Sequence, residues 1–183
     1  RIRAAAVTRT AQRVREGVGY VSEDRKGEGL ALPMSIGDNL CATRPTFAVR
    51  TLGLLDLAKQ AKEARRWIAE LRVRAHSPRQ PVRALSGGNQ QKVAIGRLLH
   101  QQAEILLLDE PTRGIDIGSK AEIYDIIARQ ADAGCAVLFV SSYLPELFGI
   151  SDRIAVMCRG RLSEARPVAE WSPESVMAAA IGN

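Results

Sequence analysis

The sequence predicts an α/β fold in which short apolar strands alternate with amphipathic helices. The apolar runs Val18–Val21, residues 105–108 and Ala136–Val140 are too short for helices, and buried parallel strands have this length and character. Helical periodicity fills much of the chain between them. Hydrophobic residues make up 46% and charged residues 25% of the 183 residues. The chain can therefore form a core and does not have the composition of a disordered protein.

The first quarter of the chain is predicted to hold two short helices around the first strand. A helix over residues 10–16 ends near Gly17 and precedes the strand Val18–Val21. Ser35 is the N-cap residue of the second helix, because a serine hydroxyl accepts a bond from the free amides of a first helical turn. That helix carries Ile36 and Leu40, and we expect loops over Ser22–Gly29 and residues 43–53.

Two longer helices are expected in the middle of the chain. Asp56–Val73 has apolar residues at the spacing of one helix face. They are Leu57, Ala61, Ala64, Ile68 and Leu71. Residues 76–82 contain Pro78 and Pro81 and form a linker. The helix that follows Ser86 has one buried face, made of Val93, Ile95, Leu98 and Leu99.

The last third continues the alternation of helices and strands. Gly118–Asp132 predicts an amphipathic helix that stops at Gly134. Its buried face contains Ala121, Tyr124, Ile127 and Ala131. The remaining elements are a helical turn at Pro145–Gly149, a strand at Arg153–Cys158, a turn at Arg159–Gly160 that leads into Arg161–Glu164, and a last helix capped by Ser172 with Pro173 at its first position.

One motif predicts a site for an anion. Residues 85–90 read Leu-Ser-Gly-Gly-Asn-Gln, so two adjacent glycines open the helix that follows Ser86. Glycine lets the main chain approach an anion that a Cβ atom would hold away. The positive end of the helix attracts negative charge by roughly 0.3–1 kcal/mol per interaction. A turn of this kind alone is usually just a turn.

A second motif predicts magnesium chemistry. The apolar run at 105–108 is followed directly by Asp109 and Glu110, and ligands bind at the carboxyl edge of an α/β sheet. Asp109 can hold the water shell of Mg²⁺, and Glu110 can orient or deprotonate an attacking water. An acid pair alone is usually a helix cap. Together, in this order and spacing, the two motifs are far more specific.

With these motifs the chain resembles the nucleotide-binding domain of ABC ATPases. Residues 85–90 are similar to its signature loop, residues 105–110 to its Walker B strand and residues 113–116 to its D-loop. The segments 20–26, 112–116 and 140–142, and the Gly-Gly-Asn-Gln-Gln-Lys form of the signature, resemble one subgroup more closely. That subgroup is the second nucleotide-binding half of the tandem ATPases of bacterial ribose, xylose and galactose-type sugar importers. The resemblance runs from about residue 15 to the end.

The resemblance implies an ABC-type P-loop NTPase domain. Residues of about 35–100 would form its α-helical signature subdomain, 17–34 and 101–165 its α/β core, and 166–183 a C-terminal helix. No Gly-x-x-x-x-Gly-Lys-[Ser/Thr] phosphate loop occurs in these 183 residues. We therefore expect an incomplete domain that lacks the phosphate-loop strand and helix, the C-terminal part of a longer polypeptide. By itself it should bind ATP weakly or not at all.

The implied cofactors are ATP and Mg²⁺. Ser86, Gly87, Gly88, Asn89 and Gln90 would close over nucleotide held by the opposite ATPase half, with Asp116 of the D-loop nearby. Asp109 would hold the metal ion and Glu110 would act on water.

Two positions depart from the family's pattern. Ser142 stands where a histidine normally bonds the γ-phosphate, and losing such a donor costs about 3–4 kcal/mol in the transition state. Glu23 stands at the glutamine position, where a carboxylate repels a triphosphate unless cations such as Arg25 and Lys26 offset it. The site of this half is therefore expected to be impaired, while its signature loop is expected to serve the partner's site.

The resemblance implies an ATP-hydrolysing subunit that drives sugar import at the cytoplasmic face of the bacterial inner membrane. Its partners would be the other ATPase half, two membrane permease subunits and, indirectly, a periplasmic sugar-binding protein. An alternative is a non-catalytic regulatory half that completes the partner's site in trans. A third possibility, a soluble ABC protein of DNA repair or ribosome function, usually has coiled-coil insertions or basic linkers, and no such heptad run is visible.

The composition adds little to these functional hypotheses. The net charge of +6 does not indicate nucleic-acid binding, because the arginines have few aromatic neighbours and fall on expected solvent-facing positions. Examples are Arg65, Arg66, Arg72 and Arg74. Cys41, Cys135 and Cys158 lack paired spacing and are expected to be reduced thiols, and His76 and His100 are isolated. No apolar run approaches the ~20 residues of a membrane span.

Overall fold

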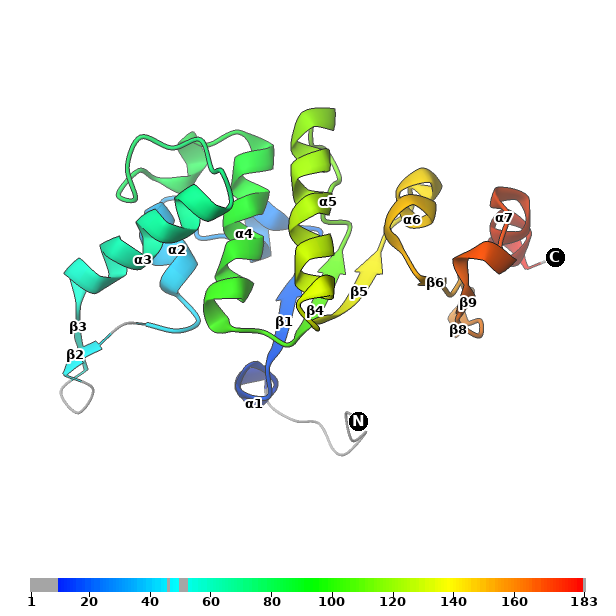
Figure 1. Cartoon of the computed structure of the whole chain (residues 1–183), viewed down its shortest axis with the longest axis horizontal. Helices are drawn as coiled ribbons and strands as arrows, with labels where there is room; N and C mark the ends of the chain where they lie inside the picture. Colours follow the sequence, from blue (N-terminus) through cyan, green and yellow to red (C-terminus); the bar gives the residue numbers. More distant parts are fainter. Residues whose placement is uncertain (1–9, 46, 50–52, 183) are drawn as a thin grey trace. The chain divides into compact units, whose positions relative to one another are not determined.

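The computed structural model describes residues 10–45, 47–49 and 53–182. The chain forms two compact units, one that ends at Val140 and one that begins at Ser141. Figure 1 shows the elements in chain order. The expected boundary between the α/β core and a C-terminal helix, at residues 165 and 166, falls inside the second unit.

A parallel sheet forms the centre of the first unit. Its strands β1 (Val18–Val21), β4 (Ile105–Asp109) and β5 (Ala136–Val140) lie in the order β1-β4-β5. Val18 is paired with Ile105, which is paired with Ala136, so the three strands are in register. Both pairings are parallel, and the three strands lie close to their predicted positions. The carboxyl ends of the strands therefore meet at one edge of the sheet.

The described helices of the first unit cover only one face of this sheet. The helices α4 (Gly87–Gln101) and α5 (Ile117–Asp132) pack against it, and Val21, Leu106 and Leu108 on that face are buried. On the opposite face Tyr20, Leu138 and Val140 are 51%, 59% and 49% exposed. The prediction that Ala136–Val140 is a buried strand is therefore wrong. In the first unit β5 is an edge strand, with one neighbour and a half-exposed outer face.

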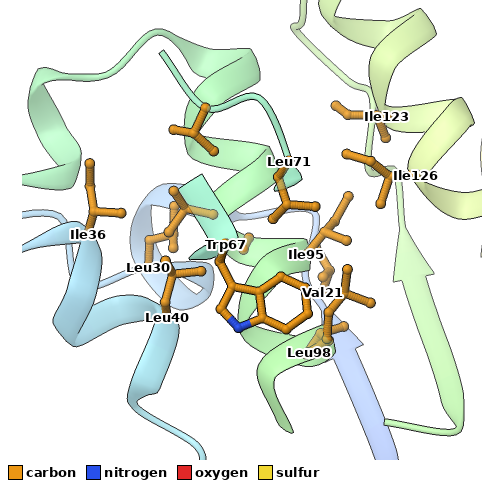
Figure 2. Close-up of a cluster of buried hydrophobic side chains, with 14 of the residues drawn as sticks. Val21, Leu30, Ile36, Leu40, Trp67, Leu71, Ile95, Leu98, Ile123 and Ile126 are labelled. Carbon is orange, nitrogen blue, oxygen red and sulfur yellow. The ribbon is translucent and has the colours of Figure 1, made fainter. Parts of the chain in front are cut away.

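The helices α2 (Ile36–Cys41), α3 (Leu57–Glu70) and α4 form a helical layer beside the sheet. Their shared core contains Ile36, Leu40, Trp67, Leu71, Ile95 and Leu98 (Figure 2). The predicted apolar face of α3 is partly wrong: Leu57 is 69% exposed, whereas Trp67, absent from that face, is buried. Leu57 is the first residue after the cap Asp56 and lies at the outer end of the helix. The Trp67 indole donates to Nδ1 of His100 over 3.1 Å.

Helix α4 is buried on almost all sides, not on the one face predicted for it. Twelve of its 15 residues are buried, because it contacts α2, α3, α5 and strand β1. Gly96 allows this close packing: a Cβ atom there would lie 2.5 Å from Leu71 Cδ1 and 2.9 Å from Leu40 Cδ2. Helix periodicity identified α4, but it could not report how many neighbours the helix has.

The apolar face predicted for α5 is also partly wrong. Its buried residues are Ile123, Ile126 and Ile127, whereas Ala121 and Ala131 are exposed. The isoleucines bury more apolar surface per residue, which determines the orientation of the helix. The predicted stop is confirmed, since Gly134 adopts φ +94° just beyond the helix.

The short N-terminal elements largely follow the predictions. The helix α1 spans Thr10–Arg15, and Ser35 caps α2 through a capping box with Asp38. Two predicted loops contain regular structure. A π-helical turn, η1, occupies Arg25–Gly29. The strands β2 (Phe47–Val49) and β3 (Leu54–Leu55) pair antiparallel; residues 46 and 50–52 of the second predicted loop lie outside the described residues. The 3₁₀ turn η3 (Val82–Ala84) leads into α4.

The second unit has its own small core, made of Ile154, Val156, Trp171 and Val176. Its elements are α6 (Leu144–Ile150), β6 (Arg153–Ile154), β7 (Met157–Cys158), β8 (Arg161–Leu162), β9 (Arg166–Pro167), η4 (Val168–Glu170) and α7 (Pro173–Ile181). The predicted strand Arg153–Cys158 is two strands, because β6 pairs with β9 and β7 pairs with β8. Between them the Val156 amide donates to the Ser163 hydroxyl.

The turn and the cap predicted for this unit are confirmed. Arg159 and Gly160 both have positive φ, 48° and 79°, as a two-residue hairpin turn requires. Ser172 caps α7 with Pro173 in the first turn. Among the described residues of both units, no helix has the length and apolar character needed to cross a membrane.

Candidate functional site

The two acids predicted from the sequence lie at the carboxyl edge of the parallel sheet. Asp109 ends β4, and its Oδ2 accepts a bond from the Tyr20 hydroxyl over 3.3 Å. Glu110 follows with φ +44°, a left-handed conformation, and its amide donates to Val140 O over 2.9 Å. A residue other than glycine held in this region is strained, and such residues cluster at functional sites. Nothing in the sequence pattern indicated this backbone conformation.

A cavity of about 570 Å³ opens beside Asp109. Its lining combines acidic and basic side chains, which suits a ligand that carries both phosphates and a cation. The lining residues are Tyr20, Ser22, Glu23, Asp24, Arg25, Lys26, Glu28, Asp109 and Arg113. The structure therefore brings the predicted residues Glu23 and Asp109 together, although they are far apart in sequence.

Glu23 is paired with Arg113 of the D-loop segment. The two side chains are 45% and 66% exposed, so this ion pair contributes only about 0–1 kcal/mol to stability. Its role is positional: the loop after β1 and the segment after β4 are joined across the cavity. The sequence suggested Arg25 and Lys26 as the cations that offset Glu23, but the direct partner is Arg113.

The loop after β1 is ordered by its own side chains. Asp24 accepts a bond from the Gly27 amide over 2.8 Å. Ser22 Oγ accepts from the Asp24 amide over 3.2 Å and donates to Glu28 Oε2 over 2.8 Å. Burial lowers the pKa of Arg25 from its ordinary value, and its Nε atom is buried without a hydrogen-bond partner. The segment, which was predicted to be a loop, contains a defined turn.

The signature motif forms the first turn of α4. Ser86 is the N-cap, as predicted, and its Oγ accepts from Asn89 Nδ2 over 2.9 Å. Asn89 Oδ1 accepts from the Arg74 amide over 2.9 Å, and Gln90 Nε2 donates to Leu85 O over 3.1 Å. Both amide side chains are buried. The predicted binding residues Asn89 and Gln90 therefore direct their side chains toward the surrounding backbone and hold the turn in place.

The two glycines of the motif have a packing role that the sequence reading missed. A Cβ atom at Gly87 would lie 3.2 Å from Arg25 Nη2 and 3.7 Å from Gly114 O. A Cβ atom at Gly88 would overlap the side chain of Ser119 on α5. The turn therefore lies closely between the loop after β1 and the D-loop segment. In the described part of the chain, no acceptor bonds the amides of Gly87 and Gly88.

The other two predicted site residues, Asp116 and Ser142, do not line the cavity. Asp116 is the N-cap of α5 and accepts from the Ser119 amide over 2.9 Å; this hydrogen bond holds the pKa of Asp116 below its ordinary value. Ser142 belongs to the second unit and is exposed. Its neighbour Ser141 donates to Glu146. The structure thus groups Glu23, Asp109, Glu110, Asp116 and the signature turn within one unit, without Ser142.

Asp109 has the donor chemistry that Mg²⁺ prefers. This ion is usually held by one or two carboxylates together with phosphate oxygens and water. Asp109 presents its carboxylate to the cavity at the end of β4. Its contact with the Tyr20 hydroxyl orients one carboxylate oxygen. The residues present therefore fit a magnesium ion that also binds phosphate.

Comparison with solved structures defines the fold class. An ABC transporter of proposed metal-chelate type, solved in an inward-facing conformation, matches 91% of this chain and 64% of its own chain with a TM-score of 0.72 and 15% identity. The fold is that of an α/β NTPase domain of the ABC type. A family model described as ABC transporter matches residues 1–113, more than half of the chain. The chain therefore belongs to the ABC transporter family.

Relatives in this family show much higher identity. A ribose import ATP-binding protein of Rubrobacter xylanophilus is 42% identical over 89% of this chain and 33% of its own length. One from Streptomyces avermitilis is 49% identical over 90% and 31%. An arabinose import ATP-binding protein of Rhizobium meliloti is 45% identical over 92% and 33%. The chain spans about a third of the length of the curated relatives it matches.

Proposed function

We propose that this chain belongs to an ATP-binding and ATP-hydrolysing subunit that drives sugar import across the bacterial inner membrane. The observation that carries the proposal is the acid pair Asp109–Glu110 at the sheet edge, in a chain whose relatives are named as sugar import ATP-binding proteins. The subunit would act at the cytoplasmic face. Its partners would be a second ATPase half, two permease subunits and, through them, a periplasmic sugar-binding protein.

Within this proposal each acid has a separate role. Asp109 would hold Mg²⁺, whose charge offsets that of the phosphates. Glu110, the next residue, would accept a proton from the attacking water or orient it. The hydrogen bond between the Glu110 amide and Val140 O supports this role, because it fixes the backbone from which the carboxylate projects. Glu23 would remain compatible with a triphosphate because Arg113 neutralises it.

The signature turn would serve a nucleotide held by the partner half. Ser86 caps a helix of 15 residues that begins with Gly87 and Gly88 and whose positive end favours a phosphate. Asn89 and Gln90 would maintain the shape of the turn through their bonds to the backbone. Asp116 would keep the D-loop in register with the first turn of α5.

A second candidate function is a non-catalytic half that completes the partner's site in trans. The serine at position 142 favours it, because a short neutral hydroxyl replaces the imidazole that the family's pattern has there. In this alternative the signature turn remains necessary, whereas Glu110 is dispensable. The two candidates therefore make opposite predictions for one substitution.

The test measures ATP turnover by the assembled importer with Glu110→Gln, and separately with the partner half's catalytic glutamate replaced by glutamine. If this half hydrolyses ATP and both halves must fire, Glu110→Gln lowers turnover by about 10²-fold or more. If it only completes the partner's site, Glu110→Gln leaves turnover unchanged and the partner's substitution abolishes it. Ser86→Arg should abolish turnover in both cases, and intact turnover would refute the role of the signature turn.

A further inference from the structure

The signature turn is held in place by a side chain from a distant part of the sequence. Arg25, in the loop after β1, extends to the first turn of α4. Its Nη1 donates to Gln91 Oε1 over 3.5 Å, and its Nη2 lies where Gly87 leaves room, 3.2 Å from the position that a Cβ atom would occupy. One planar guanidinium group therefore bonds Gln91 of α4 through one nitrogen and lies beside Gly87 with another.

The charge arrangement around Arg25 is unusual for a purely structural arginine. No ion pair to Arg25 occurs within the described residues, and its Nε atom is buried without a hydrogen-bond partner. The group also lies beside the positive end of α4, where cations are unfavourable. This placement of the guanidinium group does not favour the stability of the fold. An anion bound in front of the turn would make the placement favourable, because it would pair with the positive charge.

The loop that carries Arg25 is anchored on both sides. Asp24 caps the turn η1, and Gly29 packs against the aliphatic part of Arg25, with a Cβ position 3.7 Å from Arg25 Cβ. Two residues before Arg25, Glu23 pairs with Arg113 of the D-loop segment. The same short loop therefore contacts the signature turn through Arg25 and the D-loop segment through Glu23.

From these contacts we infer that Arg25 is a positioning residue that holds the signature turn in the geometry that binds a nucleoside triphosphate. The inference rests on the proposed function. The two-pronged guanidinium is the essential feature, because one nitrogen donates to Gln91 while another nitrogen of the same rigid plane lies beside Gly87. Lysine keeps the charge but lacks this fork. Arg25 thereby makes the loop after β1 and the signature turn move as one body.

The experiment compares Arg25→Lys and Arg25→Gln with the control Lys62→Gln in the assembled ATPase. Lys62 is exposed on α3 and does not line the cavity, so the control removes one charge without touching the turn or the candidate site. Both Arg25 variants should raise the KM for ATP by about tenfold, with a smaller change in kcat. The control should leave both constants near those of the unmodified protein.

Hydrogen exchange of the unliganded protein gives a readout that does not depend on turnover. In both Arg25 variants the amides of residues 90–92, the first in α4 with backbone acceptors, should exchange about tenfold faster, while those near the C-terminal end of α4 stay unchanged and report an intact fold. Full rescue by Arg25→Lys would overturn the inference in favour of a simple charge effect, as would Arg25 variants that match the control. If the unmodified protein neither binds nor hydrolyses ATP, the proposed function fails as well.

Discussion

The buried Lys92 of α4 offers the sharpest test of which interactions fix α4 against its neighbours. The Lys92 side chain is 2% exposed; its Nζ pairs with Glu122 of α5 and donates to Arg72 O over 3.0 Å. This residue thus connects α4, α5 and the segment after α3. We expect Glu122→Gln to destabilise the fold more than Lys92→Met does, although both variants remove the same ion pair.

The expected magnitudes follow from which group remains buried. Breaking a buried ion pair from one side costs about 3–5 kcal/mol, because the other charge stays without compensation. The Glu122 side chain is 35% exposed, so water can partly solvate the Lys92 ammonium, and about 2–3 kcal/mol is expected for Glu122→Gln. Lys92→Met removes the buried charge itself and leaves Arg72 O without this donor, which costs about 1 kcal/mol.

The pH dependence provides an independent check. The hydrogen bond from Lys92 is the main reason that the pKa of Glu122 lies below its ordinary value of 4.5. A carboxyl with a depressed folded-state pKa stabilises the fold above its unfolded value, and this contribution is lost as the pH falls through the folded-state pKa. The difference in stability between the unmodified chain and Glu122→Gln should therefore be full above pH 4.5 and shrink below it.

The assay is urea unfolding of the single variants and the double variant. With a slope of about 2 kcal/mol per M, Glu122→Gln should lower the midpoint by roughly 1 M and the double variant by about half as much. Glu63→Gln is a matched control, because the pair of Glu63 with Arg66 lies on the surface at 3.4 Å and should contribute less than about 1 kcal/mol. If Lys92→Met destabilises the fold more than Glu122→Gln, the uncompensated buried ammonium is not the largest cost of breaking this ion pair, and the reasoning is refuted.

Three further outcomes are expected. Gly96→Ala should destabilise the chain by about 1–2 kcal/mol in thermal unfolding, because the cost of overpacking against Leu71 exceeds the helix-propensity gain of about 1 kcal/mol. A rise in Tm would contradict the close packing at Gly96. Leu138→Lys, on the exposed face of β5, should reduce any self-association seen in analytical ultracentrifugation without lowering Tm, since Leu138 is 59% exposed. Unchanged association would show that this face does not mediate self-association. Burial raises the pKa of the Cys41 thiol to about 11, so at pH 8 only about one molecule in a thousand carries the Cys41 thiolate. Mass spectrometry should therefore find that iodoacetamide alkylates Cys41 far more slowly than Cys158. Equal rates would contradict the burial of Cys41.

Local sequence patterns identified most elements of the structure. The strand Val18–Val21 and the caps Ser35, Ser86 and Ser172 lie where they were predicted. These features depend on neighbours within a few residues, such as a hydroxyl that bonds an amide three positions later. For the same reason the turn at Arg159–Gly160 could be read directly from the sequence.

Predictions of burial were less successful, because burial depends on distant segments. The composition of β5 is that of a core strand, yet Leu138 and Val140 are half exposed, since no described element of the first unit covers that face of the sheet. Helix α4 shows the opposite error: its polar residues Gln91 and Lys92 are buried, since α2, α3, α5, β1 and η1 surround it. Periodicity reports which residues share a face, but not what covers that face.

For the candidate site, the sequence by itself determined which residues are proposed to carry the chemistry: the acids Asp109 and Glu110 and the glycines of the signature turn. Their residue types and spacing were sufficient, because phosphate and magnesium binding use a small set of donors. Only the tertiary structure decided that Arg113 neutralises Glu23, that Arg25 supports the turn at Gly87, and that Glu110 has a left-handed backbone. The two side-chain contacts join segments far apart in sequence, and the backbone angle is set by packing at the sheet edge.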